Sequence, residues 1–241
     1  MNNIISLSGG KDSTAMLLMM LERKEPIHSV VFSDTGWEFP AMYAHLDLLE
    51  KRTGVKIWRL QPRLPFEYWM IYRPVIAREG ENKGKVHRIG NGWPSPLRRW
   101  CTRQKIDVIE YFCKPIENPV SCIGYADDEK NRGVPDSKTL KRFPLQELGM
   151  TEKDCLKYCY SKGYHWDGLY KIFNRVSCFC CPLKKLGALR KLRKFYPELW
   201  WKMLEMDKAI EVNRGFKGYK TVHDLEKRFA EEDRQRKILP W

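Results

Sequence analysis

Residues 4–13 read Ile4-Ile5-Ser6-Leu7-Ser8-Gly9-Gly10-Lys11-Asp12-Ser13, an apolar run that ends in a glycine-rich polar turn. The apolar run predicts a buried strand, and the helical spacing of apolar residues over 14–21 predicts a helix directly after the turn. Glycines let the backbone turn sharply beside a ligand, and the N–H groups of a helix start favour an anion there. Lys11 adds a point charge suited to phosphate. The stretch therefore predicts a phosphate-binding loop whose spacing is not the Walker pattern.

The first part of the chain alternates between strand and helix patterns. Strands are expected over 4–7, 27–32, 55–60 and 120–124, and helices over 13–24, 40–53, 98–112 and 151–162. This alternation predicts an α/β fold with a parallel twisted sheet and flanking helices. Ligands of such sheets bind at the carboxyl ends of strands. We therefore expect the 8–13 loop and the turn Asp34-Thr35-Gly36 to face one site.

The rest of the chain is less regular. Residues 79–92 are rich in glycine, asparagine and charge and predict a mobile loop. From Lys184 onward the sequence is helical and basic, with breaks near Pro197 and at 215–218. We expect two domains, a nucleotide-binding domain at 1–185 and a helical basic extension at 186–241 packed on it.

The formal net charge is +14 in 241 residues, which favours polyanionic partners such as nucleic acid. In the basic segment, cations lie close to aromatic residues, as surfaces that bind single strands do. We expect Leu186, Leu189, Leu192 and Trp200 to pack on the sheet, which leaves only the role of the cations open. No apolar run reaches the roughly 18 residues of a membrane span. The start of the chain shows no signal-peptide pattern, and we expect a cytoplasmic protein with no membrane partner.

Further segments follow the order of one family. They are Asp34-Thr35-Gly36-Trp37-Glu38-Phe39-Pro40, Arg99-Trp100-Cys101-Thr102, Ile123-Gly124-Tyr125-Ala126-Asp127-Asp128-Glu129, Arg142-Phe143-Pro144-Leu145, Thr151-Glu152-Lys153-Asp154, Asn174-Arg175-Val176-Ser177-Cys178 and Cys181-Pro182. With the 8–13 loop, these segments resemble the phosphoadenosine phosphosulfate (PAPS) reductase family of the PP-loop, or N-type ATP pyrophosphatase, superfamily. The resemblance covers residues 4–185 and only loosely the remainder.

The resemblance implies an adenine nucleotide alpha-hydrolase-like fold that binds ATP or a PAPS-like adenine nucleotide with Mg²⁺. It implies catalytic roles for Lys11 and Asp12. The residues that it places at the nucleotide are Ser8, Gly9, Gly10, Lys11, Asp12, Ser13, Asp34, Thr35, Gly124 and Arg132. Arg132 is the candidate for a phosphate or sulfate group.

One departure bears on the reaction. The thioredoxin-dependent reductases of this family carry a nucleophilic cysteine in a Glu-Cys-Gly-(Ile/Leu)-His motif, and this sequence has no cysteine after Cys181. Because a thiolate has to attack the sulfur, the ordinary sulfonucleotide reduction is not expected. A reductase in which Cys180 replaces the usual nucleophile stays an alternative.

The chain has eight cysteines, at positions 101, 113, 122, 155, 159, 178, 180 and 181. A disulfide set is not expected in the cytosol, which leaves metal binding, catalysis or burial. Family members with an iron–sulfur cluster use a tandem pair and a later Cys-x-x-Cys, so the resemblance implies Cys101, Cys178 and Cys181 as ligands of a [4Fe–4S] cluster. Zinc and a metal-free set of thiols are the alternatives. Cys155 and Cys159 lie four residues apart on one helical face, and we expect them to be buried.

These features predict a sulfur-transfer enzyme that activates an acceptor with ATP and releases pyrophosphate. The acceptor is expected to be a nucleic acid, tRNA or DNA, and Cys101 to belong to the sulfur chemistry together with a sulfur-donor protein. The alternatives are the reductase with Cys180 and a nucleotide-binding partner subunit without catalysis.

Overall fold

The computed structural model of the protein describes residues 2–132 and 139–238. It divides into two compact units, each made of two stretches of chain. We call Met1–Arg63 with Arg103–Ser177 the sheet unit, and Leu64–Thr102 with Cys178–Trp241 the hairpin unit. These compact units need not be domains that fold independently. The domain boundary predicted at residue 185 therefore stays a prediction.

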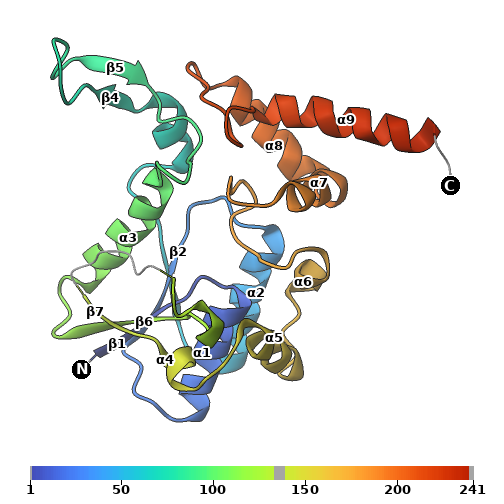
Figure 1. Ribbon diagram of the computed structural model, residues 1–241. Helices are drawn as coiled ribbons and strands as arrows, with labels where there is room; N and C mark the ends of the chain where they lie inside the picture. The colour runs from blue at the N-terminus through green and yellow to red at the C-terminus, as the bar shows by residue number, and fades with distance from the viewer. Residues whose placement is uncertain (1, 133–138, 239–241) are drawn as a thin grey trace. The chain divides into compact units, whose positions relative to one another are not determined.

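The sheet unit is built on a five-stranded sheet in which all pairs are parallel (Figure 1). Its strands are β1 (Asn2–Ser6), β2 (Ser29–Ser33), β3 (Ile57–Leu60), β6 (Pro119–Ile123) and β7 (Leu140–Arg142), in the order β3-β2-β1-β6-β7. This confirms the parallel α/β fold predicted from the alternation of patterns. The chain moves outward on one side of β1 through β2 and β3, and on the other through β6 and β7. The strand order therefore reverses beside β1, and ligands bind at such points.

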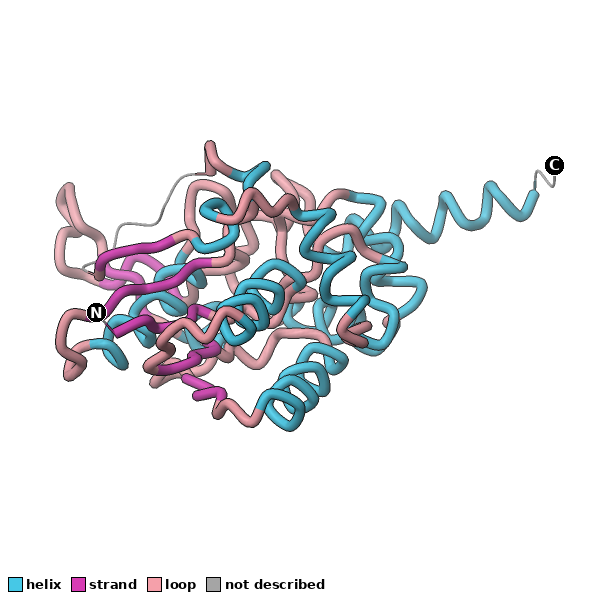
Figure 2. Tube along the Cα trace, turned by 90° about the horizontal axis from the view of Figure 1, so that it is seen from below, coloured by secondary structure: helices cyan, strands magenta, loops and turns pink. Residues whose placement is uncertain are grey.

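Helices run beside these strands (Figure 2). They are α1 (Lys11–Glu22), α2 (Pro40–Thr53), α4 (Pro144–Glu147), α5 (Glu152–Ser161), α6 (Leu169–Ile172) and most of α3 (Trp100–Cys113), with short 3₁₀ turns η2 (Asp127–Glu129) and η3 (Trp166–Gly168). Ile109 and Phe112 of α3 pack against Ile4 of β1 and Val31 of β2, and this apolar burial stabilises the sheet. The start of α5 is fixed by a capping box, in which the side chains of Thr151 and Asp154 each bond the other's backbone N–H.

The hairpin unit contains an antiparallel pair, β4 (Pro74–Ile76) and β5 (Val86–Ile89), which follows a π-helical turn η1 (Tyr68–Tyr72). The expectation of a mobile loop over 79–92 is corrected here, because β5 lies inside that segment. The sequence pattern is too polar to predict a strand, but backbone bonds such as Gly90 N to Arg73 O, 2.8 Å, hold it in place. The three helices α7 (Leu186–Phe195), α8 (Pro197–Lys208) and α9 (Val222–Ile238) confirm the helical segment and its predicted breaks.

None of the helices in the described part of the chain combines the length and the apolar character needed to cross a lipid bilayer.

A buried carboxylate at the end of α8 holds the hairpin unit together. Asp207 is 3% exposed, and its Oδ1 accepts hydrogen bonds from Trp93 Nε1 at 2.7 Å and Asn213 Nδ2 at 2.8 Å. Its Oδ2 accepts from the backbone N–H groups of Val222, 3.1 Å, and His223, 3.3 Å, at the start of α9. One side chain thus joins α8, α9 and the segment after β5, and satisfies donors that burial would otherwise leave unpaired.

We predict that Asp207→Asn destabilises the protein by about 3 kcal/mol, because the new amide N–H groups would face the two backbone donors of α9. Urea and thermal unfolding followed by tryptophan fluorescence measure the loss. Glu211→Gln, an exposed change of the same kind nearby, is the control and should leave stability within about 0.5 kcal/mol. A loss below 1 kcal/mol for Asp207→Asn would contradict this account.

Candidate functional site

The loop between β1 and α1 has the backbone that its glycines predict. Gly9 has a φ of +75°, and a Cβ built there would lie 2.5 Å from Met42 Sδ. Gly10 precedes the first residue of α1 and provides no side-chain cap. The helix start is thus left without the usual side-chain oxygen, as in anion-binding loops.

Buried groups behind the loop fix its shape. The carbonyl of Gly9 accepts a hydrogen bond from Trp166 Nε1 at 2.7 Å and a longer one from Thr14 Oγ1 at 3.5 Å. The indole of Trp166 stacks on His45 with 4.4 Å between ring centroids, and His45 Nε2 lies 2.9 Å from Thr14 Oγ1. The burial of His45 lowers its pKa to about 3, so the ring is neutral at physiological pH. The loop therefore rests on a neutral, packed support.

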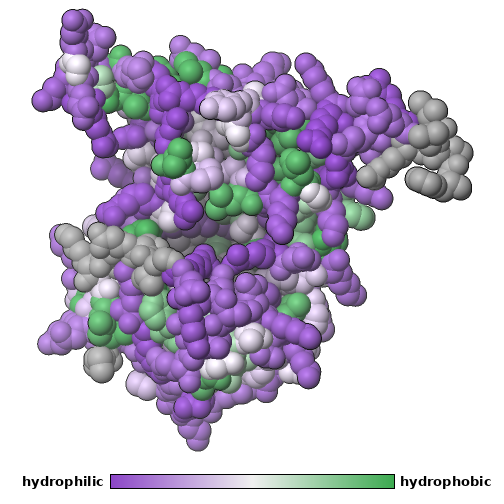
Figure 3. All heavy atoms as spheres, in the orientation of Figure 1, coloured by the Kyte–Doolittle hydropathy of each residue, from purple (hydrophilic) through white to green (hydrophobic). Residues whose placement is uncertain are grey.

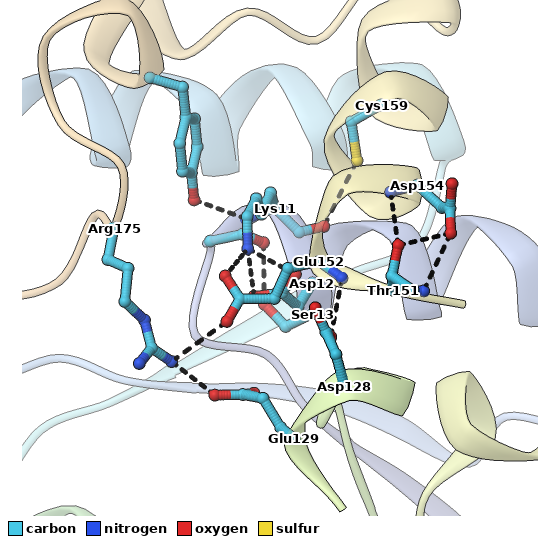
Figure 4. A network of polar contacts seen from close by, with 12 residues as sticks. Lys11, Asp12, Ser13, Asp128, Glu129, Thr151, Glu152, Asp154, Cys159 and Arg175 are labelled. Carbon is cyan, nitrogen blue, oxygen red and sulfur yellow. Dashed lines mark hydrogen bonds and ion pairs between the residues drawn. The ribbon is translucent and has the colours of Figure 1, made fainter. Parts of the chain in front are cut away.

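Lys11 is tied at three atoms (Figure 4). Its backbone N–H donates to Tyr170 Oη at 2.7 Å, and its carbonyl accepts from Cys159 Sγ at 3.4 Å. Its Nζ donates to Asp12 Oδ1 at 2.8 Å and Glu152 Oε2 at 2.6 Å. Burial acts to lower the pKa of Lys11, but the charges and hydrogen bonds of Asp12 and Glu152 outweigh it and raise that pKa. The side chain is a fully charged ammonium in a fixed place, at the end of the loop.

Carboxylates gather around this ammonium. Glu152 accepts from Lys11, and its own backbone N–H donates to Asp128 Oδ1 at 3.0 Å. Arg175 pairs with Glu129 at 2.6 Å and reaches Glu152 at 3.9 Å. Burial raises the pKa of Asp12, an effect increased by Glu152 and Glu129 although Lys11 opposes it. A phosphate that enters this network would meet several carboxylates as well as Lys11.

Asp34 and Thr35 follow β2, the strand next to β1 in the sheet. Asp34 Oδ1 accepts from Gly36 N at 2.8 Å and from Tyr43 Oη at 2.7 Å, which shapes the turn. The hydroxyl of Thr35 is buried and has no hydrogen-bond partner among the described residues. A buried hydroxyl without a partner is costly unless a ligand satisfies it, and the roles of Asp34 and Thr35 at a nucleotide stay predictions.

Gly124 lies directly after β6, the other neighbour of β1. A Cβ built on it would lie 2.9 Å from both N and Cα of Ser13. Because backbone atoms cannot give way as a flexible side chain does, only glycine allows this strand end to approach the loop. Ser13 in turn accepts from Ser8 N at 3.1 Å. The structure thus brings together the loop residues and Gly124.

Among the described residues, Arg132 is connected to this network through an acidic neighbour. Its NH1 pairs with Glu129 at 3.1 Å, the carboxylate that also binds Arg175, and its guanidinium lies 4.3 Å from the ring centroid of Tyr125. Its role at a phosphate or sulfate group stays a prediction. Arg175 is the better-placed cation, because it reaches Glu152, the carboxylate that binds Lys11.

Cys101, Cys178, Cys180 and Cys181 belong to the hairpin unit. The backbone turns between Cys178 and Cys181, whose N–H donates to Cys178 O at 3.2 Å. Lys217 Nζ holds the following carbonyls of Pro182 and Lys184, each at 2.9 Å. Cys180 is 2% exposed, whereas Cys101, Cys178 and Cys181 are partly exposed.

The predicted cluster ligands are not gathered as a metal site. Within residues 2–132 and 139–238, no three His, Cys, Asp or Glu side chains are arranged to hold a metal ion. The described side chains therefore give no support to a [4Fe–4S] cluster or a zinc ion at Cys101, Cys178 and Cys181, and these ligands stay a prediction. All eight cysteines lie in the described residues, and none forms a disulfide. Cys155 and Cys159 are buried, as expected, and burial raises the pKa of Cys155 to about 12.

Sequence reasoning did not assign the groups that hold the loop. Glu152 and Tyr170 bind Lys11, Trp166 binds Gly9, and Arg175 reaches Glu152. Glu152 and Arg175 stand inside segments that carried the family resemblance, so a signal existed for both. Trp166 and Tyr170 lie more than 150 residues from the loop in the sequence, and no local sequence pattern predicts such a contact.

Comparison with known proteins agrees with the resemblance. Residues 2–71 match the model of the phosphoadenosine phosphosulfate reductase domain. Two uncharacterized proteins of Methanocaldococcus jannaschii are similar: MJ0066 at 26% identity over 88% of this chain and 43% of its own length, and MJ0973 at 23% over 90% and 51%. An uncharacterized 37.8 kDa protein of Escherichia phage 186 is 33% identical over 48% of this chain and 30% of its own. The chain spans about half or less of the length of these relatives.

A solved structure is also similar, the U34-tRNA thiolase NcsA from Methanococcus maripaludis with its [4Fe-4S] cluster. The match has 14% identity and a TM-score of 0.46, and covers 95% of this chain and 72% of that one. This likeness is too distant to transfer the role of any residue.

We predict a pH-dependent contribution of His45 to stability. An unfolded histidine has a pKa of about 6.5, and the folded ring resists the proton down to about 3. The contribution is present above pH 6.5 and is lost as the pH falls toward 3, by up to about 1.4 kcal/mol per pH unit. We measure the free energy of unfolding of the native protein and of His45→Gln by urea unfolding from pH 7.5 to 4.5. The stability of the native protein relative to the variant should fall with this slope as the pH falls below 6.5. The same comparison for the exposed His87→Gln should show no such slope, and a flat His45 difference would contradict the prediction.

We also predict that Gly124→Ala weakens nucleotide binding without unfolding the protein. Forcing a methyl group against the backbone of Ser13 costs about 1–3 kcal/mol, equivalent to about 5- to 150-fold in affinity if the loop moves to relieve it. Calorimetric titration with Mg-ATP measures the effect. Gly187→Ala, which meets open space on a helix, is the control, and equal affinities for the two variants would refute the assignment of Gly124.

Proposed function

We propose that this chain, whose residues 2–71 match the model of the phosphoadenosine phosphosulfate reductase domain, binds an adenine nucleotide on the 8–13 loop. In this proposal the protein uses ATP to activate an acceptor, releases pyrophosphate, and takes part in sulfur transfer. The chain spans half or less of its curated relatives, so the activity proposed is that of the described site.

The observation that carries the proposal is the fixed ammonium of Lys11 at the end of an uncapped, glycine-built helix start. The N–H groups of such a start and a nearby cation together favour phosphate oxygens. The support behind the loop holds it in one shape before a ligand arrives, which reduces the entropy lost on binding. The buried, unpartnered hydroxyl of Thr35 and the close approach at Gly124 add groups that a nucleotide could contact.

The loop would act on the α–β bond of ATP. A nucleophilic oxygen of the acceptor attacks the α-phosphorus and forms a new P–O bond, and the bond to the β-phosphate breaks with its electrons leaving on pyrophosphate. Lys11 and the N–H groups of α1 stabilise the negative charge that develops on the leaving oxygens. A sulfur nucleophile at the oxidation level of sulfide would then attack the activated atom, and the new bond to sulfur would replace the bond to the AMP oxygen, so that AMP leaves with that electron pair.

The donor set suits Mg²⁺ bound together with the nucleotide. Mg²⁺ is commonly held by one or two carboxylates plus phosphate oxygens and water, and Asp12, whose carboxylate binds Lys11 Nζ at the end of the loop, would be one of them. When bound, Mg²⁺ supplies charge neutralisation for the phosphates beside Glu152 and Glu129. Asp12 and Glu152 hold Lys11 in place, and Tyr170 Oη yields or shares the Lys11 N–H when a phosphate oxygen reaches it.

The sulfur source remains part of the proposal. Partial exposure favours Cys101, Cys178 and Cys181 as carriers of sulfur delivered by a donor protein, because a reacting thiolate has to be reached. The burial of Cys180 gives no support to the reductase in which this residue is the nucleophile.

The experiment is a binding and product assay with Lys11→Gln. We expect Mg-ATP to bind the native protein and to bind the variant about 10- to 150-fold more weakly, since charge-assisted hydrogen bonds contribute about 1.5–3 kcal/mol. Anaerobic incubation with ATP, a mixed tRNA and DNA acceptor pool, and sulfide should give pyrophosphate and AMP that depend on Lys11. PAPS and adenosine phosphosulfate should give no sulfite.

Lys51→Gln is the matched control, an exposed lysine on α2 with the same charge change, and should bind ATP normally. Circular dichroism confirms that both variants are folded. Equal ATP affinity in the native protein and Lys11→Gln would refute the nucleotide site. Sulfite release from PAPS would replace the proposed reaction by the reductase.

A further inference from the structure

Three arginines of the hairpin unit come together from separate segments. Arg88 lies on β5, Arg98 closes the turn Ser95–Arg98, and Arg214 lies between α8 and α9. A Cβ at Gly92 would lie 3.8 Å from Ile210, and the ring of Trp93 contacts that of Phe216 at 5.0 Å. The chain on either side of Arg214 therefore packs against the chain that links Arg88 to Arg98.

The positive charges of Arg98 and Arg214 both act on Arg88, so the three guanidinium groups lie within electrostatic reach of one another. Across the residues described by the structure, none of the three has an acidic partner, and Arg88 Nε donates only to the carbonyl of Gly90 at 3.1 Å. Burial lowers the pKa of Arg88, and the positive charges of Arg214 and Arg98 lower it further. Like charges held together in this way favour a bound anion.

The basic helix α7 differs. Arg193 makes a bidentate pair with Glu226, at 2.8 and 2.9 Å, and a third bond to Asp233 at 2.6 Å. Arg190 pairs with Glu232 of the same helix, α9. The segment that the sequence singled out as a basic surface thus has its arginines neutralised within the fold.

Exposed apolar side chains accompany the arginine cluster. Leu97, beside Arg98, is 95% exposed, and Tyr219, on the Lys217–Lys220 turn that follows Arg214, is 98% exposed. The surface over β4 and β5 mixes hydrophilic side chains with exposed apolar ones, among them Ile76 and Val86 (Figure 3). Separate guanidinium groups on an open surface suit repeated phosphates, and a free tyrosine ring beside them can stack on a base.

We propose that Arg88, Arg98 and Arg214 bind the phosphodiester backbone of a single-stranded nucleic acid, with Tyr219 stacking on a base. The bound nucleic acid would be the acceptor of the proposed sulfur transfer. The purpose of this binding therefore rests on the proposed function, whereas the binding itself does not. Binding is measured without nucleotide, so its failure is distinguishable from failure of the nucleotide site.

The test is fluorescence anisotropy with labelled 20-nucleotide RNA, DNA and duplex DNA between 50 and 200 mM salt. Removing three phosphate contacts in Arg88→Gln/Arg98→Gln/Arg214→Gln should reduce the slope of log affinity against log salt by about 2 for single strands. Tyr219→Ala should weaken single-strand binding about 5- to 150-fold and leave duplex binding unchanged. The RNA and DNA arms identify which strand is preferred.

The matched control is Lys185→Gln/Lys191→Gln/Lys194→Gln, which removes the same charge from α7 and should change affinity less than threefold. Arg98→Glu alone, on an exposed turn, should weaken nucleic-acid binding without affecting folding. Lys11→Gln should bind the nucleic acid as the native protein does. Equal losses in the arginine and lysine triple variants would overturn the proposal. So would the absence of binding at 50 mM salt, preference for the duplex, loss of binding in Lys11→Gln, or full displacement by millimolar inorganic phosphate.

Discussion

The carbonyl of Gly9 is the point on which the nucleotide loop depends. It accepts the indole N–H of Trp166, and the stacked His45 holds that indole in place. Because a buried donor or acceptor without a partner costs about 1–3 kcal/mol, the loop cannot easily leave this arrangement. Gly9 adopts a positive φ in this arrangement, and the loop leads into a helix start without a side-chain cap. The anion binding proposed for the loop thus rests on aromatic packing behind it.

The same rigidity limits what Lys11 can do alone. Asp12 and Glu152 hold its ammonium, and the negative charge that fixes it also opposes an incoming phosphate. A nucleotide accompanied by Mg²⁺ removes this conflict, because the ion offsets charge on both the phosphates and the carboxylates. Free sulfate or phosphate lacks that compensation. The site is therefore suited to a metal-bound polyphosphate more than to a lone anion.

Sequence patterns within a few residues predicted those parts of the fold and of the site whose conformation depends on neighbouring residues. The helix over 40–53 was predicted with the bounds observed, because Pro40 starts it and Gly54 ends it with a φ of +70°. The 8–13 loop was recognisable from its glycines. Trp166 could not be predicted, since its hydrogen bond to Gly9 joins residues 157 positions apart. The strand β5 was missed because backbone pairing with β4 stabilises a polar sequence that has little strand propensity of its own.

The net charge of +14 is a second case in which the sequence alone does not show what the fold does with its residues. A count of basic residues points first to α7, yet Arg190 and Arg193 are neutralised by acids of α9 that lie more than thirty residues later in the sequence. Arg88, on a short strand in a polar segment, instead has two further arginines, Arg98 and Arg214, as the charged groups that act on it. A basic helix therefore predicts a nucleic-acid interface only after the acids of every element packed against it have been counted.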